Sequence, residues 1–139
     1  IFGSLKLGLV AILPNTFPML TVFGLMGWLD FNLDITTLMT APIIIGIAVD
    51  DTIHFITHYR LSLLKGASIS EAIHSTLHEV GQAIIITTLI LMSIFLFFIP
   101  VSHVGVSRFS ILAVIAVFSA LLADLFLLPA LCRVLRVRV

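Results

Sequence analysis

The chain has 139 residues, of which 60% are hydrophobic and 10% are charged, and its formal net charge at pH 7 is zero. A soluble domain is about half apolar and about a quarter charged, so this composition excludes an ordinary soluble domain and indicates a membrane-embedded one. The neutral charge balance argues against nucleic acid as a partner, and the single cysteine, Cys132, excludes an internal disulfide and a cysteine-rich metal site.

Four segments are long and apolar enough to cross a bilayer, which takes about 20 residues per helix. They cover about 7–29, 36–57, 83–101 and 109–131. We therefore predict an all-α membrane protein in which 1–139 forms a single domain, a four-helix transmembrane bundle. Pro14 and Pro18, next to Asn15, predict a kink in the first span. The chain starts with Ile1 and has no signal-peptide pattern, so we interpret it as part of a longer polypeptide.

Basic residues predict the direction of the spans. One side of the four-span layout carries six of them: Lys6, Arg60, Lys65, Arg133, Arg136 and Arg138. The other side carries Arg108, which is expected to anchor the interface, together with Asp30 and Asp34. By the positive-inside rule, both ends of the chain and the segment between the second and third spans are cytoplasmic. We expect a multi-pass protein of the inner (plasma) membrane.

The segment between the second and third spans predicts a short amphipathic helix over about 69–80. Ser68 stands three residues before Glu71, which is the pattern of a capping box. An apolar face then follows at helical spacing: Ile69, Ala72, Ile73, Leu77 and Val80. We expect this helix to lie along the cytoplasmic surface of the membrane.

The second span contains "GIAVDDTIHF", in which two acids and a histidine interrupt an apolar run. At about 100° per residue, Asp50 and Asp51 share one side of the helix with four other residues. These are Gly46, His54, Thr57 and His58. The opposite side holds Ile45, Ala48, Thr52, Phe55 and Ile56. The polar stripe must therefore face protein or water instead of lipid.

Intramembrane acids mark a functional site by default. A central Asp costs roughly 2.5 to 3.5 kcal/mol on insertion scales, and two adjacent carboxylates repel, which favours proton uptake by one of them. We predict that Asp50 and Asp51 form a proton relay, with His54 as a nearby member. The alternative is a structural role, in which the acids hydrogen-bond to a neighbouring span. Gly46 would let another helix approach closely.

Three further polar residues are possible relay partners. Asp124 follows a line of small residues that includes Ala116 and Ala120, which are expected to pack helices closely, and a helix-end role is the alternative. Thr87 and Thr88 in the third span either bond to carbonyls of their own helix or donate to a carboxylate across the bundle.

Histidine pairs four residues apart, His54 with His58 and His74 with His78, allow a metalloenzyme as an alternative. "HEVGQ" has Gln82 where a zincin needs its second histidine, so that class is excluded. No phosphate-binding loop or nucleophile elbow is present. We expect no metal and no cofactor, and we predict that the protein is not an enzyme.

The motif "GIAVDDTIHFITHYR" is preceded by "LPNTFP" and followed by "LLADLFLLPAL". Together these segments resemble the resistance–nodulation–division (RND) superfamily of permeases, in particular its MMPL-type exporter branch. That branch is related to the sterol-sensing-domain proteins Patched and Dispatched. The resemblance implies two halves of six spans each, with these four spans as the last four of the second half. It also implies carboxylates as relay groups in the fourth and tenth spans, a position that Asp50 and Asp51 match. Many MMPL-type members have Asp-Tyr where this chain has Asp-Asp.

The resemblance implies a proton-motive-force-driven exporter of lipids or hydrophobic compounds. Its expected partners are membrane lipids, protons, a lipidic substrate and the rest of the same polypeptide, with a homo-oligomer possible. Two other functions stay open. One is a sterol-sensing-like module that binds lipid and passes on a signal, and the other is a protein-secretion accessory subunit of the same superfamily.

Overall fold

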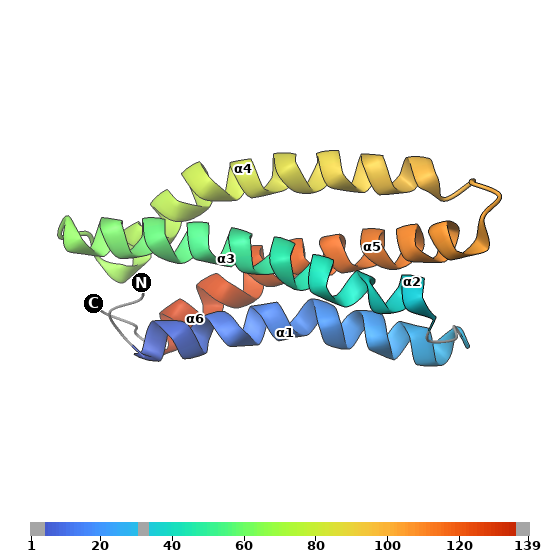
Figure 1. Ribbon diagram of the computed structural model, residues 1–139. Coiled ribbons are helices and arrows are strands. Elements are labelled where there is room, and N and C mark those ends of the chain that lie inside the picture. Colours follow the sequence, from blue (N-terminus) through green and yellow to red (C-terminus); the bar gives the residue numbers. More distant parts are fainter. Residues whose placement is uncertain (1–4, 31–33, 136–139) are drawn as a thin grey trace.

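The computed structural model describes residues 5–30 and 34–135, and these form long helices that run alongside one another (Figure 1). The elements in chain order are α1 (Leu5–Trp28), α2 (Ile35–Leu38), α3 (Thr40–Leu64), α4 (Ile69–Phe98), α5 (Val104–Leu122), the π-helix η1 (Ala123–Leu127) and α6 (Leu128–Val134). The described residues contain no strand. Because α5, η1 and α6 follow one another without a break, they make a single fourth long helix.

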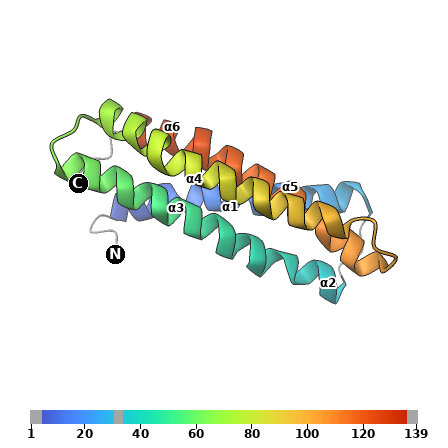
Figure 2. The same ribbon diagram turned by 90° about the horizontal axis from the view of Figure 1, so that it is seen from above.

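Each of the four long helices is sufficiently long and apolar to cross a membrane: Val10–Trp28, Thr40–Leu64, Ile69–Phe98 and Val104–Val134. The predicted fold class, an all-α transmembrane bundle, is therefore confirmed. The start of α1, the α3–α4 turn and the end of α6 lie at one end of the bundle, and the α4–α5 turn lies at the other (Figures 1 and 2). Arg136 and Arg138, part of the predicted basic end, lie outside the described residues.

The segment 69–80 differs from its prediction. It is helical from Ile69, and Ser68 and Glu71 form the predicted capping box, but the helix continues into the third span as α4. No proline interrupts the backbone between Val80 and Ala83. Gly81 is buried at a close contact with η1, where an added Cβ would lie 3.4 Å from Leu125 Cδ2. The helix is thus the first third of a span and not a separate surface helix.

The apolar face of this first third of α4 packs on protein. Ala72 is fully buried in a core cluster with Phe55, Ile56, Tyr59 and Leu128, close to the α3–α4 turn. A second cluster fills the bundle farther from that turn and consists of Val22, Met26, Ile44, Leu112 and Ala116. Ile73 and Leu77 are half-buried against the same cluster, so much of the predicted apolar face is in contact with protein.

The first span keeps both prolines inside a helix that runs unbroken from Leu5 to Trp28. Each proline lacks an N–H, so the carbonyls of Val10 and Pro14 lose their helical donors. Pro14 and Pro18 are themselves buried, which means that neighbouring helices cover this part of α1. The predicted kink therefore does not divide the span into two helices.

Candidate functional site

Helix α3 has one packed face and one open face. The packed face is made of buried side chains: Thr40, Ile44, Ala48, Thr52, Phe55, Ile56 and Tyr59. The open face carries the polar stripe, with Asp50 and His54 exposed and Asp51 and His58 half-buried. Four of the five residues predicted for the opposite face are buried, whereas Ile45 is 37% exposed. Helical periodicity alone therefore separates the two faces almost completely.

A groove of about 430 Å³ runs between α3 and α4 along this polar stripe. Its lining from α3 is Asp50, Asp51, His54 and His58, and its lining from α4 is Glu79, Val80, Ala83, Ile84 and Thr87. The groove brings together the three predicted relay residues and one of their predicted partners, Thr87. It also contains two titratable side chains, those of His58 and Glu79, that the sequence reading left out of the site.

Contacts within the groove differ along its length. His54 Nε2 lies 3.8 Å from Asp50 Oδ1, which suits an ion pair when the imidazole is protonated but is too long for a hydrogen bond. At the end near the α3–α4 turn, His58 bridges the two helices. Its Nδ1 lies 3.1 Å from Thr76 Oγ1, and its Nε2 lies 3.1 Å from Glu79 Oε2. Direct bonds thus join α3 and α4 at this end of the groove.

The packed face of α3 holds a second polar cluster, buried among three helices. Thr52 Oγ1 lies 2.7 Å from Asp124 Oδ1 in η1 and 3.1 Å from Asn15 Oδ1 in α1. Asp124 is 1% exposed, and its Oδ2 has no hydrogen-bond partner. Among the residues described, no basic side chain lies within ion-pair distance of Asp124. A buried carboxyl group without a counter-charge is stable in a membrane mainly in its neutral form.

Hydrogen bonding links the protonation of Asp124 to the orientation of the Asn15 amide. The Thr52 hydroxyl has one proton and forms a full hydrogen bond with one acceptor oxygen. If that proton goes to Asn15 Oδ1, the short contact between Thr52 and Asp124 requires a proton on Asp124. The ionised form instead requires the Asn15 amide to be turned by 180°, so that its nitrogen donates to Thr52.

The π-helix η1 places Asp124 in this cluster. Its wide turn is visible in the bond from the Leu128 N–H to the Ala123 carbonyl, five residues back. Pro129 follows immediately, and its ring would crowd the Leu125 carbonyl in a regular α-helix. A π-turn just before the proline relieves that crowding and rotates the side chains that precede it.

The remaining predicted residues are placed as follows. Ala116 and Ala120 are buried at helix contacts, at 0% and 3% exposure. Gly46 faces outward, and no described atom lies within 4 Å of where its Cβ would be. The Thr87 hydroxyl lies 3.2 Å from the Ala83 carbonyl and 3.0 Å from the Ile84 carbonyl, both in its own helix, whereas Thr88 is buried and does not line the groove. Asp124 is separated from the groove by the body of α3.

Sequence reasoning missed Thr52, Thr76 and Glu79. Thr52 does carry a signal, because a hydroxyl in the middle of an otherwise apolar helix face requires a partner on the facing helix. Thr76 and Glu79 carry none, since their roles depend on the third span being continuous with the segment before it. Within 5–30 and 34–135, no three His, Cys, Asp or Glu side chains are grouped so as to hold a metal ion.

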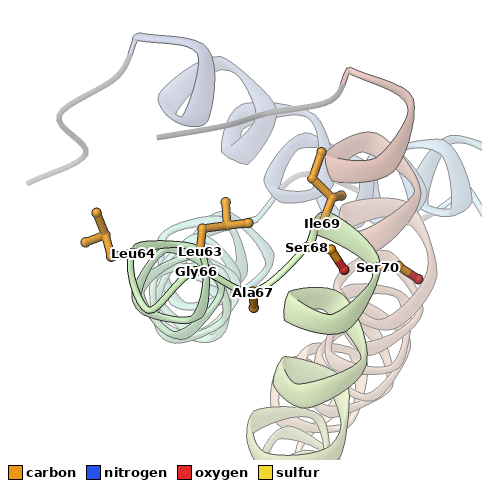
Figure 3. A pocket seen from close by; sticks show the side chains of 7 residues that line it. All are labelled: Leu63, Leu64, Gly66, Ala67, Ser68, Ile69 and Ser70. Carbon is orange, nitrogen blue, oxygen red and sulfur yellow. The ribbon is translucent and has the colours of Figure 1, made fainter.

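A larger hollow of about 550 Å³ lies at the α3–α4 turn and is lined by side chains between Leu63 and Ser70 (Figure 3). Its lining is largely aliphatic, and the Ser68 hydroxyl is already engaged as the acceptor for the Glu71 N–H. Gly66 has a φ of 91°, which the tight connection requires. The hollow follows from the shape of this turn and contains no titratable side chain.

The fold and the groove define a multi-pass α-helical membrane protein with carboxyl groups inside its spans. The family model described as Patched SSD matches residues 3–134. The chain therefore belongs to this family, and its resemblance to RND-type permeases is confirmed.

Two curated relatives agree with this assignment. The hopanoid transporter HpnN of Burkholderia multivorans is 30% identical over 102 residues, which cover 73% of this chain and 12% of the relative. The putative membrane protein MJ1562 of Methanocaldococcus jannaschii is 32% identical over 80 residues, which cover 58% of this chain and 21% of the relative. The matches thus span a small part of each relative's length. No solved structure matches the chain.

Proposed function

We propose that this chain is part of a proton-motive-force-driven RND/MMPL-type exporter in the inner (plasma) membrane, and that it moves lipids or other hydrophobic compounds. The observation that carries the proposal is the groove in which Asp50, Asp51 and His54 lie together on the open face of a membrane-spanning helix. A similar protein is named as a hopanoid transporter, which supports a lipidic substrate for this one.

The chemistry of the groove fits proton coupling. A carboxylate at the centre of a bilayer costs roughly 2.5 to 3.5 kcal/mol, so the neutral forms of Asp50 and Asp51 tolerate a state in which other helices cover the groove better than the charged forms do. One proton that crosses a potential of 100 mV carries about 2.3 kcal/mol. The free energy carried by one proton that binds at these residues is therefore large enough to bias α3 between two positions relative to its neighbours.

Asp124 enters the proposal as a second proton-binding carboxyl. Its hydrogen-bond partner Thr52 directly follows Asp51 in α3 and lies on the packed face of that helix. Asp124 is therefore on the side of α3 opposite the groove. In the packed arrangement of α1, α3 and η1 we assign Asp124 its neutral form, because it is 1% exposed and has no counter-charge among the described residues. Loss of its proton would leave an uncompensated charge among three helices and would favour their separation.

The rest of the polypeptide is proposed to cover the open face of α3. Gly46 presents free space one turn from Asp50, which suits the close approach of another helix. The basic side chains Arg60, Lys65 and Arg133 lie at the end of the bundle that has the α3–α4 turn, which supports a cytoplasmic position for that end.

The test is export by full-length protein that carries Asp50→Asn or Asp51→Asn. Both variants are expected to insert and accumulate normally and to lose export, because the amide cannot take up and release a proton. Asp30→Asn is the matched control: Asp30 is exposed outside the spans, and its φ of 52° is tolerated by asparagine. Normal export by both groove variants would reject the proposal.

A second candidate, a sterol-sensing-like module, is favoured by the family description and by an apolar hollow of about 490 Å³. Its lining is Phe17, Leu122, Ala123, Phe126, Leu127 and Ala130, and it faces out from the bundle between α1 and the fourth long helix. If this function holds, Phe126→Ala lowers photolabelling by a lipid probe and abolishes signalling, while Asp50→Asn leaves both unchanged.

A further inference from the structure

The groove between α3 and α4 has a row of titratable side chains along it. Asp50, His54 and His58 stand four residues apart on α3, and each step along the helix is about 6 Å. The row therefore leads from the pair of acids toward the α3–α4 turn, and it ends where Glu79 from α4 meets His58.

The bonds of His58 define its hydrogens. The Thr76 hydroxyl donates its single proton to the Ala72 carbonyl at 2.7 Å, so Thr76 Oγ1 can only accept from His58 Nδ1. With Nδ1 protonated, the contact of 3.1 Å between His58 Nε2 and Glu79 Oε2 is a hydrogen bond when a second proton lies on Nε2 or on Oε2. These two placements differ by a proton transfer between hydrogen-bonded atoms.

This pair lies at the mouth of the groove, by which we mean the end nearest the α3–α4 turn. The His58 side chain is 26% exposed and that of Glu79 is 65% exposed, while those of His54 and Asp50 are 69% and 73% exposed, so the groove is open along its length. The wall between this pair and Asp51 contains the small side chain of Ala83 and the hydroxyl of Thr87. A groove of about 430 Å³ has room for several water molecules, whose share of liquid volume is about 30 Å³ each.

We infer that this groove is a water-filled route for protons between Asp50–Asp51 and the cytoplasm, with the His58–Glu79 pair as the proton-exchange group at its mouth. The inference rests on the proposed proton-coupled function and on the proposed cytoplasmic position of the α3–α4 turn. The charged and titratable groups that face the route are Asp50, Asp51 and His54 from α3 and Glu79 from α4. Asp124 of η1 lies on the other face of α3.

The first experiment measures water access without any reference to transport. In full-length protein from which all cysteines have been removed, Cys132 by Cys132→Ser, a single cysteine is placed at Thr87 in the groove or at Leu89, which is on α4 and 55% exposed but does not line the groove. A charged, membrane-impermeant thiol reagent attacks only thiolates, and thiols ionise only in contact with water. We expect Thr87→Cys to react from the cytoplasmic side and Leu89→Cys to stay unlabelled.

The second experiment measures proton flux by the full-length protein in vesicles with an internal pH-sensitive dye. His58→Gln and Glu79→Gln are each expected to slow proton flux at least about tenfold and to change its dependence on pH, because a positioned donor or acceptor is lost. Glu79→Asp, which keeps the carboxyl group, is expected to restore much of the flux. His78→Gln is the matched control, since His78 is exposed on the same helix and contacts only Gln82, at 3.4 Å.

The two experiments separate the route from the function. If the Asp50→Asn and Asp51→Asn variants export normally while Thr87→Cys still reacts, the proposed function is wrong but the inference of a water-filled groove stands. If those acid variants abolish flux but His58→Gln and Glu79→Gln behave like His78→Gln, the exchange group at the mouth is wrong. An unreactive Thr87→Cys, or an equally reactive Leu89→Cys, overturns the route itself.

Discussion

Replacement of Thr52 by valine tests whether the buried cluster of Asn15, Thr52 and Asp124 holds three helices together. Valine has nearly the same shape as threonine, so the change removes a hydroxyl without a large cavity. The side chain of Thr52 is fully buried and lies 2.7 Å from Asp124 Oδ1. After the change, neither carboxyl oxygen of Asp124 has a partner among the described residues, because Oδ2 has none already.

The expected loss combines two effects. Hydrogen bonds between helices in membrane proteins contribute about 0.6 kcal/mol on average and about 1.7 at most, and a buried polar group without a partner costs about 1 to 3 kcal/mol. We therefore expect Thr52→Val to lower the free energy of unfolding by about 2 to 4 kcal/mol. The double variant Thr52→Val with Asp124→Leu is expected to be more stable than Thr52→Val alone, because no carboxyl group is left unsatisfied.

The free energy of unfolding is measured by steric trapping of the full-length protein in bicelles. Ser119→Ala is the control: Ser119 is 5% exposed, and its hydroxyl donates within its own helix to the Ala116 carbonyl at 2.8 Å. Its loss is expected to cost less than about 1 kcal/mol. A Thr52→Val effect no larger than that of Ser119→Ala would refute the reasoning, as would a double variant less stable than the single one.

Three smaller predictions follow from packing and capping. Gly81→Ala is expected to change the free energy of unfolding by less than about 1 kcal/mol, because the new Cβ meets Leu125 Cδ2 at an ordinary 3.4 Å. Gly81→Leu is expected to lower the free energy of unfolding by about 1 to 3 kcal/mol in the same assay. Ser68→Ala is expected to cost about 1 kcal/mol locally and to speed hydrogen exchange in the first turn of α4, with Ser70→Ala as a neutral control; equal exchange in both would contradict the cap. Cys132, at 0% exposure, is expected to resist maleimide in native membranes and to react after SDS, and rapid native labelling would contradict its burial.

Much of the fold was predictable because membrane spans obey simple rules of length and polarity. The four spans follow from apolar runs, and the capping box at Ser68 and Glu71 follows from spacing alone. The continuity of α4 did not follow, since an amphipathic segment satisfies its apolar face equally well against lipid or against protein. Packing against side chains of other helices, such as Tyr59 of α3 and Cys132 of α6, decides in favour of protein, and these contacts cannot be read from the segment itself.

The candidate site was predictable to the extent that one helix defines it. Periodicity along α3 places Asp50, Asp51 and His54 on one side, and the structure has them in one groove. Their assignment as a proton relay stays a prediction, as do the roles of Thr87, Thr88 and Asp124. Contacts between helices were beyond reach: a π-turn rotates Asp124 toward Thr52, and the meeting of His58 with Glu79 depends on how α3 and α4 pair.

The two faces of α3 divide the consequences of mutation along a single helix. Substitutions at Ala48, Phe55 or Tyr59 change side chains that are at most 1% exposed. Their main effect is expected to be a smaller amount of folded protein in the membrane. Substitutions one or two positions away, on the side of Asp50 and His54, leave those contacts intact and change only what the groove does. A deep mutational scan that records abundance and transport separately should therefore show two interleaved stripes of sensitivity, each with the pitch of the helix.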